Sequence, residues 1–232
     1  MTTFVISPPE QASVAVRGTQ DRFPVRRIFC VGRNYAAHAR EMGKDPDRDP
    51  PFFFTKPADA VVENGATLAY PPETNNFHYE IELVVAIGKG GANIAEDNVP
   101  NHIWGASVGI DLTRRDLQLE ARDKGRPWDW GKAFDKSAPI SPLVPMADVP
   151  SLTEGRIWLA VNGEIKQDAD IADLIWSVNE HVSILSHSMA LAPGDLIMTG
   201  TPAGVGPIVP GDHVTGAVDG LADIAITVGE RA

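Results

Sequence analysis

The sequence has very little cysteine and no long apolar run. Among its 232 residues there is one cysteine, Cys30. A single thiol excludes an intrachain disulfide and favours a reducing compartment. The segment "MTTFVISPPEQASV" lacks the basic start and continuous apolar stretch of a signal peptide, and no apolar run approaches the roughly 20 residues of a membrane-spanning helix. We therefore expect a cytoplasmic protein without a membrane partner.

Basic residues are also scarce relative to acidic ones. Lys and Arg number 20 against 31 Asp and Glu, which gives a formal charge of −11, and no Lys/Arg run is longer than a pair. Nucleic acids and anionic membranes bind clustered positive charge, so neither is an expected partner. A small anion is still a possible ligand where a local group of cations or a metal ion supplies positive charge.

Nucleotide-binding motifs are missing as well. The Gly-rich segment "TGTPAGVGP", residues 199–207, lacks the Gly-Lys-Ser/Thr of a P-loop, and no GxGxxG opens a helix. Its amides and the Thr201 hydroxyl either hold a small anion or form a simple turn. Four other histidines fit solvated positions: His102, His181, His187 and His213.

The composition is that of an ordinary globular protein, with 43% hydrophobic residues. We expect one catalytic domain over residues 1–232, in which residues 1–24 form an N-terminal extension. The 21 Gly and 19 Pro are spread along the chain, as in folds with many short strands. Strands are predicted at "RRIFCVG", "ELVVAIG", "WGASVGIDLT", "IWLAVNG", "DLIMTG", "DHVTGAV" and "ADIAITV". The fold class is therefore α+β, mainly β.

Local signals predict a hairpin and two longer helices. Asn162-Gly163 is typical of a type I′ hairpin turn. In "SVNEHVSILSHSMALAPGD", Ser177 and Glu180 form a capping box. Another helix is predicted over 113–124, with Leu117 and Ala121 facing inward.

A third, shorter helix carries a His–Glu pair. The segment "NYAAHAREMG" has Asn34 as candidate cap and Gly43 as candidate terminator, so it is marginal unless something packs on it. His38 and Glu41 lie three positions apart and share one side of the helix. A carboxylate beside an imidazole raises its basicity, as a water-activating pair requires. The alternative is an exposed surface pair.

Two carboxylates occur in a segment that otherwise predicts a buried strand. Glu80 and Glu82 in "HYEIELVVAIG" project from the same face of a strand, about 7 Å apart along it. Buried together they would repel each other, and a divalent cation would remove that cost. Oxygen ligands without cysteine favour Mg²⁺, Mn²⁺ or Ca²⁺ over Zn²⁺. The alternative is a strand edge whose glutamates face water.

Further polar residues are candidates for the same site. Asp111 follows an alternating apolar strand and precedes a helix, so it either completes a metal site or caps that helix. Arg115 and Gln118 lie one helical turn apart and present donors suited to a carboxylate, although exposed pairs of this kind are common. Lys132 follows Trp128 and Trp130, an aromatic setting that would bury its ammonium, whereas most lysines are solvated.

The motifs together resemble the fumarylacetoacetate hydrolase family, and most closely its small acylpyruvase and fumarylpyruvate hydrolase branch. The resemblance covers about residues 25–229 and rests on "CVGRNYAAHAREMG", "FFFTKPADAVV", "HYEIELVVAIG", "GIDLTRRDLQ", "RPWDWGKAFDKSAP", "LAVNGEIKQ" and "LIMTGTPAGVGP", in that order. It implies a mixed β-sandwich roll, a homodimer and a small 2-oxo acid substrate.

The resemblance also implies roles for individual residues. Glu80, Glu82 and Asp111 would hold Mg²⁺ or Mn²⁺. His38 and Glu41 would activate water, and Lys132 would stabilise developing negative charge. Arg115, Gln118 and Thr201 would bind the substrate's anionic groups.

The implied reaction is hydrolysis of a carbon–carbon bond in a 2,4-diketo acid, with fumarylpyruvate as the expected substrate. Two alternatives remain: decarboxylation of oxaloacetate on the same metal, and a catalytically silent binding or scaffold protein that keeps the fold. The sequence does not indicate what contacts the distal end of the substrate.

Overall fold

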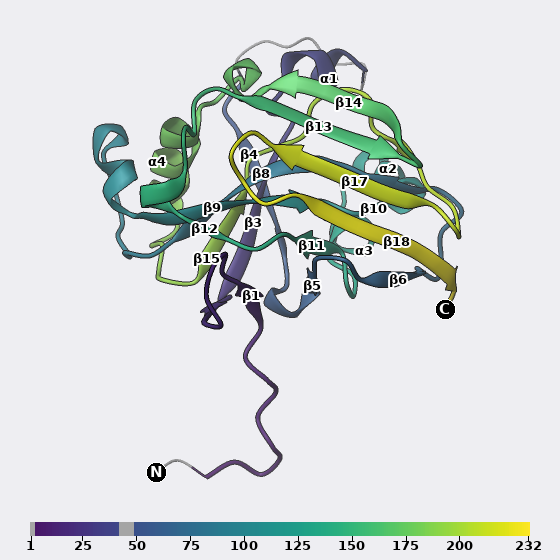
Figure 1. Ribbon diagram of the computed structural model, residues 1–232, viewed down its shortest axis with the longest axis horizontal. Coiled ribbons are helices and arrows are strands. Elements are labelled where there is room, and N and C mark those ends of the chain that lie inside the picture. The colour runs from purple at the N-terminus through teal and green to yellow at the C-terminus, as the bar shows by residue number, and fades with distance from the viewer. Residues whose placement is uncertain (1–2, 42–48) are drawn as a thin grey trace.

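The computed structural model describes residues 3–41 and 49–232, except for the side chains of Ala39 and Glu41. Two mixed β-sheets form the centre of the fold (Figure 1). The larger sheet has the strand order β4-β3-β15-β8-β9-β11-β5, and β12 also pairs with β9. Its strands are β3 Arg27–Gly32, β4 Phe52–Lys56, β5 Val61–Glu63, β8 Ile81–Ile87, β9 Ile103–Ile110, β11 Ala138–Ile140, β12 Val144–Pro145 and β15 Asp195–Met198.

The second large sheet has five strands in the order β14-β13-β17-β18-β6. They are β6 Thr67–Tyr70, β13 Arg156–Val161, β14 Glu164–Asp170, β17 His213–Val218 and β18 Ile224–Arg231. Three short strands form a separate sheet in the order β10-β7-β16, namely β7 Phe77–Tyr79, β10 Thr113–Arg114 and β16 Gly206–Pro207. Every strand predicted from the sequence is present, although β4, β5, β6 and other short strands were not predicted.

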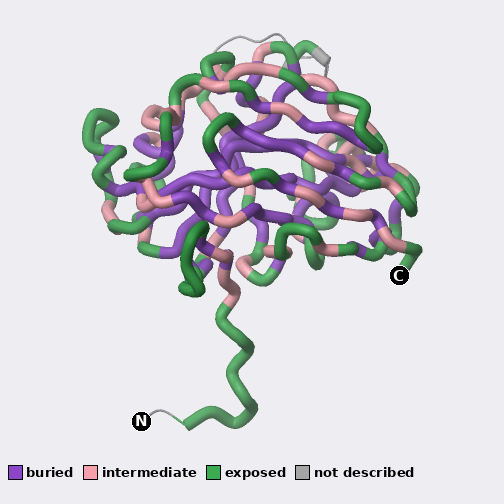
Figure 2. Tube along the Cα trace, in the orientation of Figure 1, coloured by how far each residue is buried: buried purple, intermediate pink, exposed green. Residues whose placement is uncertain are grey.

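Strand β8 is buried on both faces. Leu83, Val85 and Ile87 belong to the core cluster that also contains Ile157 and Ile226 of the second sheet. Val84 and Ala86 belong to a second cluster on the opposite face of the larger sheet. Figure 2 shows the buried residues running along the strands of both sheets. A continuous apolar sequence is the expected pattern for such a doubly covered strand.

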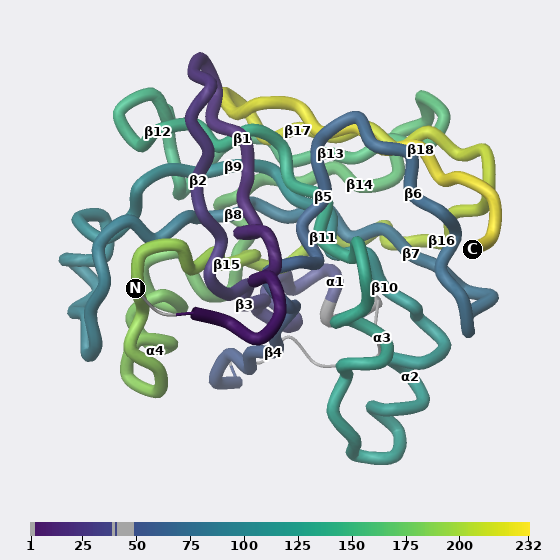
Figure 3. The backbone as a smooth tube through the Cα atoms, turned by 90° about the horizontal axis from the view of Figure 1, so that it is seen from below, coloured from purple at the N-terminus to yellow at the C-terminus, as the bar shows by residue number. Residues whose placement is uncertain are grey.

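The N-terminal region helps to cover that opposite face. Strands β1 (Ser13–Ala15) and β2 (Arg22–Pro24) pair antiparallel, and the hairpin crosses the larger sheet in Figure 3. Val14, Val16 and Phe23 are buried in the second core cluster. Residues 3–10, in contrast, are exposed and project from the body as a tail (Figure 2).

Local sequence signals predicted the helices and the hairpin well. Helix α4 (Val178–Ser188) begins at Ser177 with the predicted capping box. Helix α2 (Arg115–Asp123) lies within the predicted range, and a four-residue helix α3 (Asp129–Lys132) follows it. Between β13 and β14, Asn162 and Gly163 both have positive φ angles of 52° and 83°, as a type I′ turn requires.

Two predictions for histidines were wrong. His102 and His181 are buried, not solvated, with 6% and 0% exposure. Helix α1 (Ala36–Glu41) forms, and the amide of Asn34, its candidate cap, accepts from the Trp176 N–H and donates to the Thr199 carbonyl. Asn34 therefore ties the start of α1 to two distant segments. Gly43 lies outside the described residues.

Across the described ranges, 3–41 and 49–232, no helix is both long enough and apolar enough to cross a lipid bilayer.

Candidate active site

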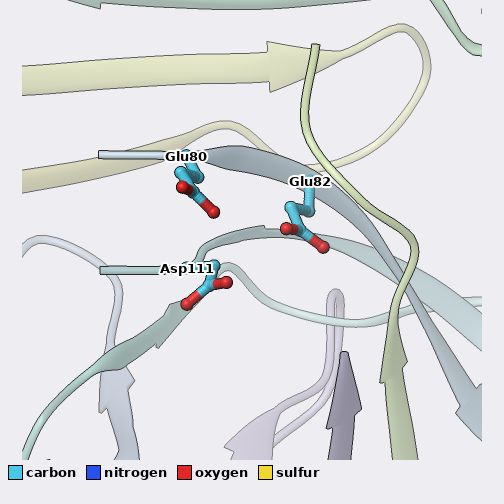
Figure 4. A group of neighbouring side chains, drawn as sticks. All are labelled: Glu80, Glu82 and Asp111. Atoms are coloured by element: carbon cyan, nitrogen blue, oxygen red, sulfur yellow. The ribbon is translucent and has the colours of Figure 1, made fainter. Parts of the chain in front are cut away.

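The pairing of β8 with β9 brings three carboxylates together. Glu82 lies opposite Gly109, and the N–H of Asp111 donates to the carbonyl of Glu80 over 2.8 Å. The three side chains therefore project from the same face of the sheet, toward one another (Figure 4). One carboxylate oxygen from each lies within 4.8 Å of the others. All three are buried, with exposures of 5% for Glu80, 2% for Glu82 and 0% for Asp111.

Buried cations surround two of these acids. The Lys132 ammonium donates to Glu80 Oε2 over 2.7 Å and to Asp111 Oδ2 over 2.5 Å. Arg115 forms a further ion pair with the other oxygen of Glu80. Lys56 Nζ lies 2.8 Å from Asp111 Oδ1, and both side chains are completely buried. Asp111 therefore forms ion pairs, and helix α2 has no side-chain cap.

The third acid has a different environment. Glu82 Oε2 accepts the Gly200 N–H over 2.7 Å. Burial raises the pKa of Glu82 well above its ordinary value, and the charges of Asp111 and Glu80 raise it further. Burial also opposes ionisation of Glu80, but Lys132 and Arg115 outweigh it and lower the pKa of that carboxyl. Negative charge at Glu82 is thus the least compensated in the cluster.

This arrangement fits a hard divalent cation. The cluster offers three carboxylates and no sulfur ligand, which suits Mg²⁺ or Mn²⁺. A cation among the three acids would offset the repulsion that Glu82 experiences from Asp111 and Glu80.

Gly200 brings its N–H to Glu82 through a conformation that other residues rarely adopt. Its φ is +99°, and a Cβ at this position would lie 2.7 Å from the Cβ of Asn34. A side chain would therefore be both strained and obstructed. The Gly-rich segment after β15 thus contributes a backbone donor to the acidic cluster.

The remaining candidate residues line the same pocket. His38, Arg115, Gln118, Lys132 and Thr201 surround it together with the three acids. His38 is buried at 6% exposure and Thr201 at 3%. The side chain of Glu41 is outside the described part of the structure, so its pairing with His38 stays a prediction.

The inward face of α2 is more polar than predicted. Its buried residues are Arg115, Gln118 and Ala121, whereas Leu117 is only half-buried. Arg115 Nη1 donates to Gln118 Oε1 over 3.2 Å. This helix therefore packs a polar surface against the pocket, and hydrophobic periodicity alone would place its buried face incorrectly.

Lys132 is positioned by close packing between α3 and α2. A Cβ on Gly131 would lie 2.7 Å from the backbone nitrogen of Gln118, so only glycine permits this approach. The Lys132 ammonium also lies 5.1 Å from the centre of the Phe54 ring. Burial alone would lower the pKa of Lys132, but Asp111 and Glu80 raise it above its ordinary value. The side chain is thereby kept as an ammonium.

Three basic residues of this region were not assigned in the sequence analysis. Lys56 ends β4 and bonds the carbonyl of Leu112 over 3.1 Å in addition to its ion pair with Asp111. Arg33 and Arg122 line the pocket. The sequence shows only that Lys56 ends an aromatic segment. Its burial and its ion pair could not be predicted, because its partners are more than fifty residues away.

The sequence is similar to known proteins over most of its length. Residues 27–229 match the family model described as fumarylacetoacetate (FAA) hydrolase C-terminal. The fumarylpyruvate hydrolase of Ralstonia sp is 51% identical over 190 residues, which cover 81% of this chain and 98% of that protein. A mitochondrial oxaloacetate tautomerase of Arabidopsis thaliana is 38% identical over 205 residues, covering 88% of this chain and 92% of that protein.

A solved structure has the same fold. The crystal structure of fumarylpyruvate hydrolase from Pseudomonas aeruginosa in complex with Mn²⁺ and pyruvate aligns with a TM-score of 0.96 at 53% identity. The alignment covers 98% of this chain and 100% of that chain. The predicted mixed β-sandwich roll is confirmed by this match.

Proposed function

Because the chain belongs to the fumarylacetoacetate hydrolase family, we propose that it is a metal-dependent hydrolase of acylpyruvates, with fumarylpyruvate as its substrate. The observation that carries the proposal is one pocket lined by three buried carboxylates, a buried histidine and buried cationic donors. Relatives named fumarylpyruvate hydrolase exceed 50% identity over most of the chain.

The reaction divides a 2,4-diketo acid into pyruvate and a second carboxylic acid. Water adds to the C4 carbonyl, the C3–C4 bond breaks, and its electron pair stays on C3 as the enolate of pyruvate until C3 takes up a proton. Held by Glu80, Glu82 and Asp111, a divalent ion would act as a Lewis acid toward the 2-oxo acid end of the substrate.

The chain's own residues would perform the remaining steps. His38 is the group in the pocket suited to take a proton from the attacking water, and Glu41 is its predicted partner. Lys132, kept cationic by the acids, would stabilise the negative charge that develops during bond cleavage. Arg115 and Gln118 would bind a substrate carboxylate, and Thr201 would accept or donate a further hydrogen bond.

An assay with purified protein tests this proposal. We expect turnover of fumarylpyruvate with Mg²⁺ or Mn²⁺, measured as loss of enol absorbance with formation of pyruvate, and no turnover after chelation.

His38→Ala should reduce the rate about 10²- to 10⁴-fold, the usual contribution of a general base. Metal-loaded protein that binds oxalate but cleaves no 2,4-diketo acid would instead indicate a silent binding protein.

A second candidate activity acts on oxaloacetate. Relatives at 38% identity are named oxaloacetate tautomerases, and decarboxylation of oxaloacetate would also pass through an enolate. Decarboxylation does not require attack by water, whereas tautomerisation needs a group that moves a proton. His38→Ala should therefore leave oxaloacetate decarboxylation less affected than hydrolysis if both use this pocket.

A further inference from the structure

The pocket contains two arginines that the proposed reaction does not use. Arg33 follows β3, and Arg122 lies in the last turn of α2, yet both line the pocket that contains the acidic cluster. They are half-buried. Arg115 and Lys132 are far less exposed, at 5% and 2%. The two half-buried arginines thus belong to a more solvent-accessible part of the pocket.

Arg33 is held in place without a carboxylate partner among the described residues. Its backbone has a left-handed φ of 58°, which is uncommon for a residue with a side chain. The centre of its guanidinium lies 5.2 Å from the centre of the Phe52 ring, a cation–π contact, and none of its N–H groups donates to an acceptor among the described residues. An anion could accept these donors.

Arg122 adds a second positive charge nearby. Its Nε donates to Asp123 Oδ1 over 2.9 Å, but that carboxylate is 65% exposed and strongly solvated. Burial lowers the pKa of Arg33, and the charge of Arg122 lowers it further, as expected for like charges that face each other. A bound carboxylate would relieve this repulsion.

The charges that line the pocket suit a substrate with two carboxylates. Four cationic side chains line it, namely Arg33, Arg115, Arg122 and Lys132. Arg115 and Lys132 already contact Glu80. The other two have no buried acid to neutralise them within the described chain, while Val31, Phe54 and Trp128 supply an apolar lining for a carbon chain.

We propose that Arg33 and Arg122 bind the distal carboxylate of a dicarboxylic acylpyruvate and thereby select diacid over monoacid substrates. This inference rests on the proposed function, because it assigns the far end of the same substrate. It concerns fumarylpyruvate, whose chain ends in a second carboxylate, in contrast to acetylpyruvate, which ends in a methyl group.

The test is the ratio of kcat/KM for fumarylpyruvate to kcat/KM for acetylpyruvate. Arg33→Gln and Arg122→Gln should each lower this ratio about tenfold or more, mainly through a higher KM for fumarylpyruvate, because a charge-assisted hydrogen bond is lost. Arg33→Lys keeps the charge but loses the planar fork, so a smaller decrease is expected. Arg126→Gln is the matched control, since this exposed arginine does not line the pocket.

Competition provides a second measurement on the same variants. Fumarate should inhibit the wild-type protein more strongly than crotonate, and the difference should shrink about tenfold in Arg33→Gln and Arg122→Gln. An unchanged ratio and unchanged inhibition, with wild-type hydrolysing both substrates, would overturn the inference but leave the proposed function intact. Wild-type protein that hydrolyses neither substrate would overturn the proposed function and this inference with it.

Discussion

At the scale of single residues, Glu82 distinguishes a metal site from a buried ion-pair network. Glu80 and Asp111 have lysine or arginine partners, whereas Glu82 accepts a backbone N–H and lies beside two other carboxylates. An ion-pair network gains nothing from such a residue, because its charge is costly to bury. A divalent cation among the three carboxylates would neutralise that charge.

Glu82→Gln should therefore weaken metal binding without unfolding the protein. The amide oxygen can still accept the Gly200 N–H, and removal of one negative charge relieves repulsion from Asp111 and Glu80. We expect Mn²⁺ affinity to fall more than about 100-fold, since loss of a partner outside the ligand sphere alone costs 10- to 100-fold. Calorimetric titration with Mn²⁺ measures this.

Thermal melting supplies the companion measurement. Mn²⁺ should raise the melting temperature of the wild-type protein and of the control Glu120→Gln, which changes an exposed glutamate paired with Lys124. It should have little effect on Glu82→Gln. Wild-type Mn²⁺ affinity in Glu82→Gln would refute the assignment.

The side-chain positions of residues whose neighbours are close in the chain could be predicted from the sequence. The alternation around Asp111 placed it opposite the apolar face of β9, and the position of Glu80 and Glu82 placed both on one face of β8. Lys56 was missed because its partner Asp111 lies in a different hairpin. Arg33 and Arg122 were missed for the same reason: they meet only in the folded pocket.

At the scale of elements, the start of α4 was predicted correctly, but the burial of its residue His181 was not. Its capping box depends on residues three positions apart, so the start of the helix could be predicted. The burial of His181 depends on what packs against the helix, which the sequence does not reveal. The same limit applies to α2, whose buried face contains Arg115 and Gln118.

The burial of His181 should make stability depend on pH. Burial lowers the pKa of His181 from 6.5 to about 4, and its Nε2 has no hydrogen-bond partner in the described structure. Between these pH values the unfolded chain binds a proton that the folded protein does not. Stability is therefore lost as the pH falls from about 6.5 toward 4, by up to about 3 kcal/mol.

Urea unfolding at several pH values between 7 and 4 measures this effect. His181→Gln should lose less free energy of unfolding on acidification than the wild-type protein does. His187→Gln, which changes an exposed histidine of the same helix, should retain the wild-type dependence. Identical pH dependence in wild-type and His181→Gln would contradict the prediction.

At the scale of the whole molecule, the described part of the predicted N-terminal extension, residues 3–24, contains an exposed segment and a packed one. Residues 3–10 are exposed, but Val14, Val16 and Phe23 complete a core cluster on the larger sheet. The sequence predicted an extension over residues 1–24. It could not show that the β1–β2 hairpin covers apolar residues of distant strands.

Two truncations should separate these parts. A chain that starts at Gln11 should keep the wild-type free energy of unfolding within about 0.5 kcal/mol, because exposed residues contribute little. A chain that starts at Arg17 should lose about 3 kcal/mol or more, since it no longer buries Val14 and Val16. Chemical denaturation measures both, and equal stability of the two truncated chains would contradict the assignment.

Light scattering on the same proteins tests the predicted assembly. The family resemblance implies a homodimer, so the full chain of 24.9 kDa should give about twice that mass. The chain that starts at Gln11 should form assemblies with the same number of subunits, because the exposed residues 3–10 project from the body. A monomeric full-length chain would exclude the predicted homodimer.

The single cysteine occupies a position from which the motion of the larger sheet can be followed. Cys30 lies in β3 between Phe54 of β4 and Met198 of β15, with 0% exposure. Burial raises the pKa of its thiol well above the ordinary value, and Asp111 raises it further. The side chain belongs to the core cluster that Val14, Val16 and Phe23 help to cover, so reagents that require an accessible thiolate can react only after this face of the larger sheet is uncovered. The rate of thiol modification is a built-in kinetic reporter of that opening, without any engineered label.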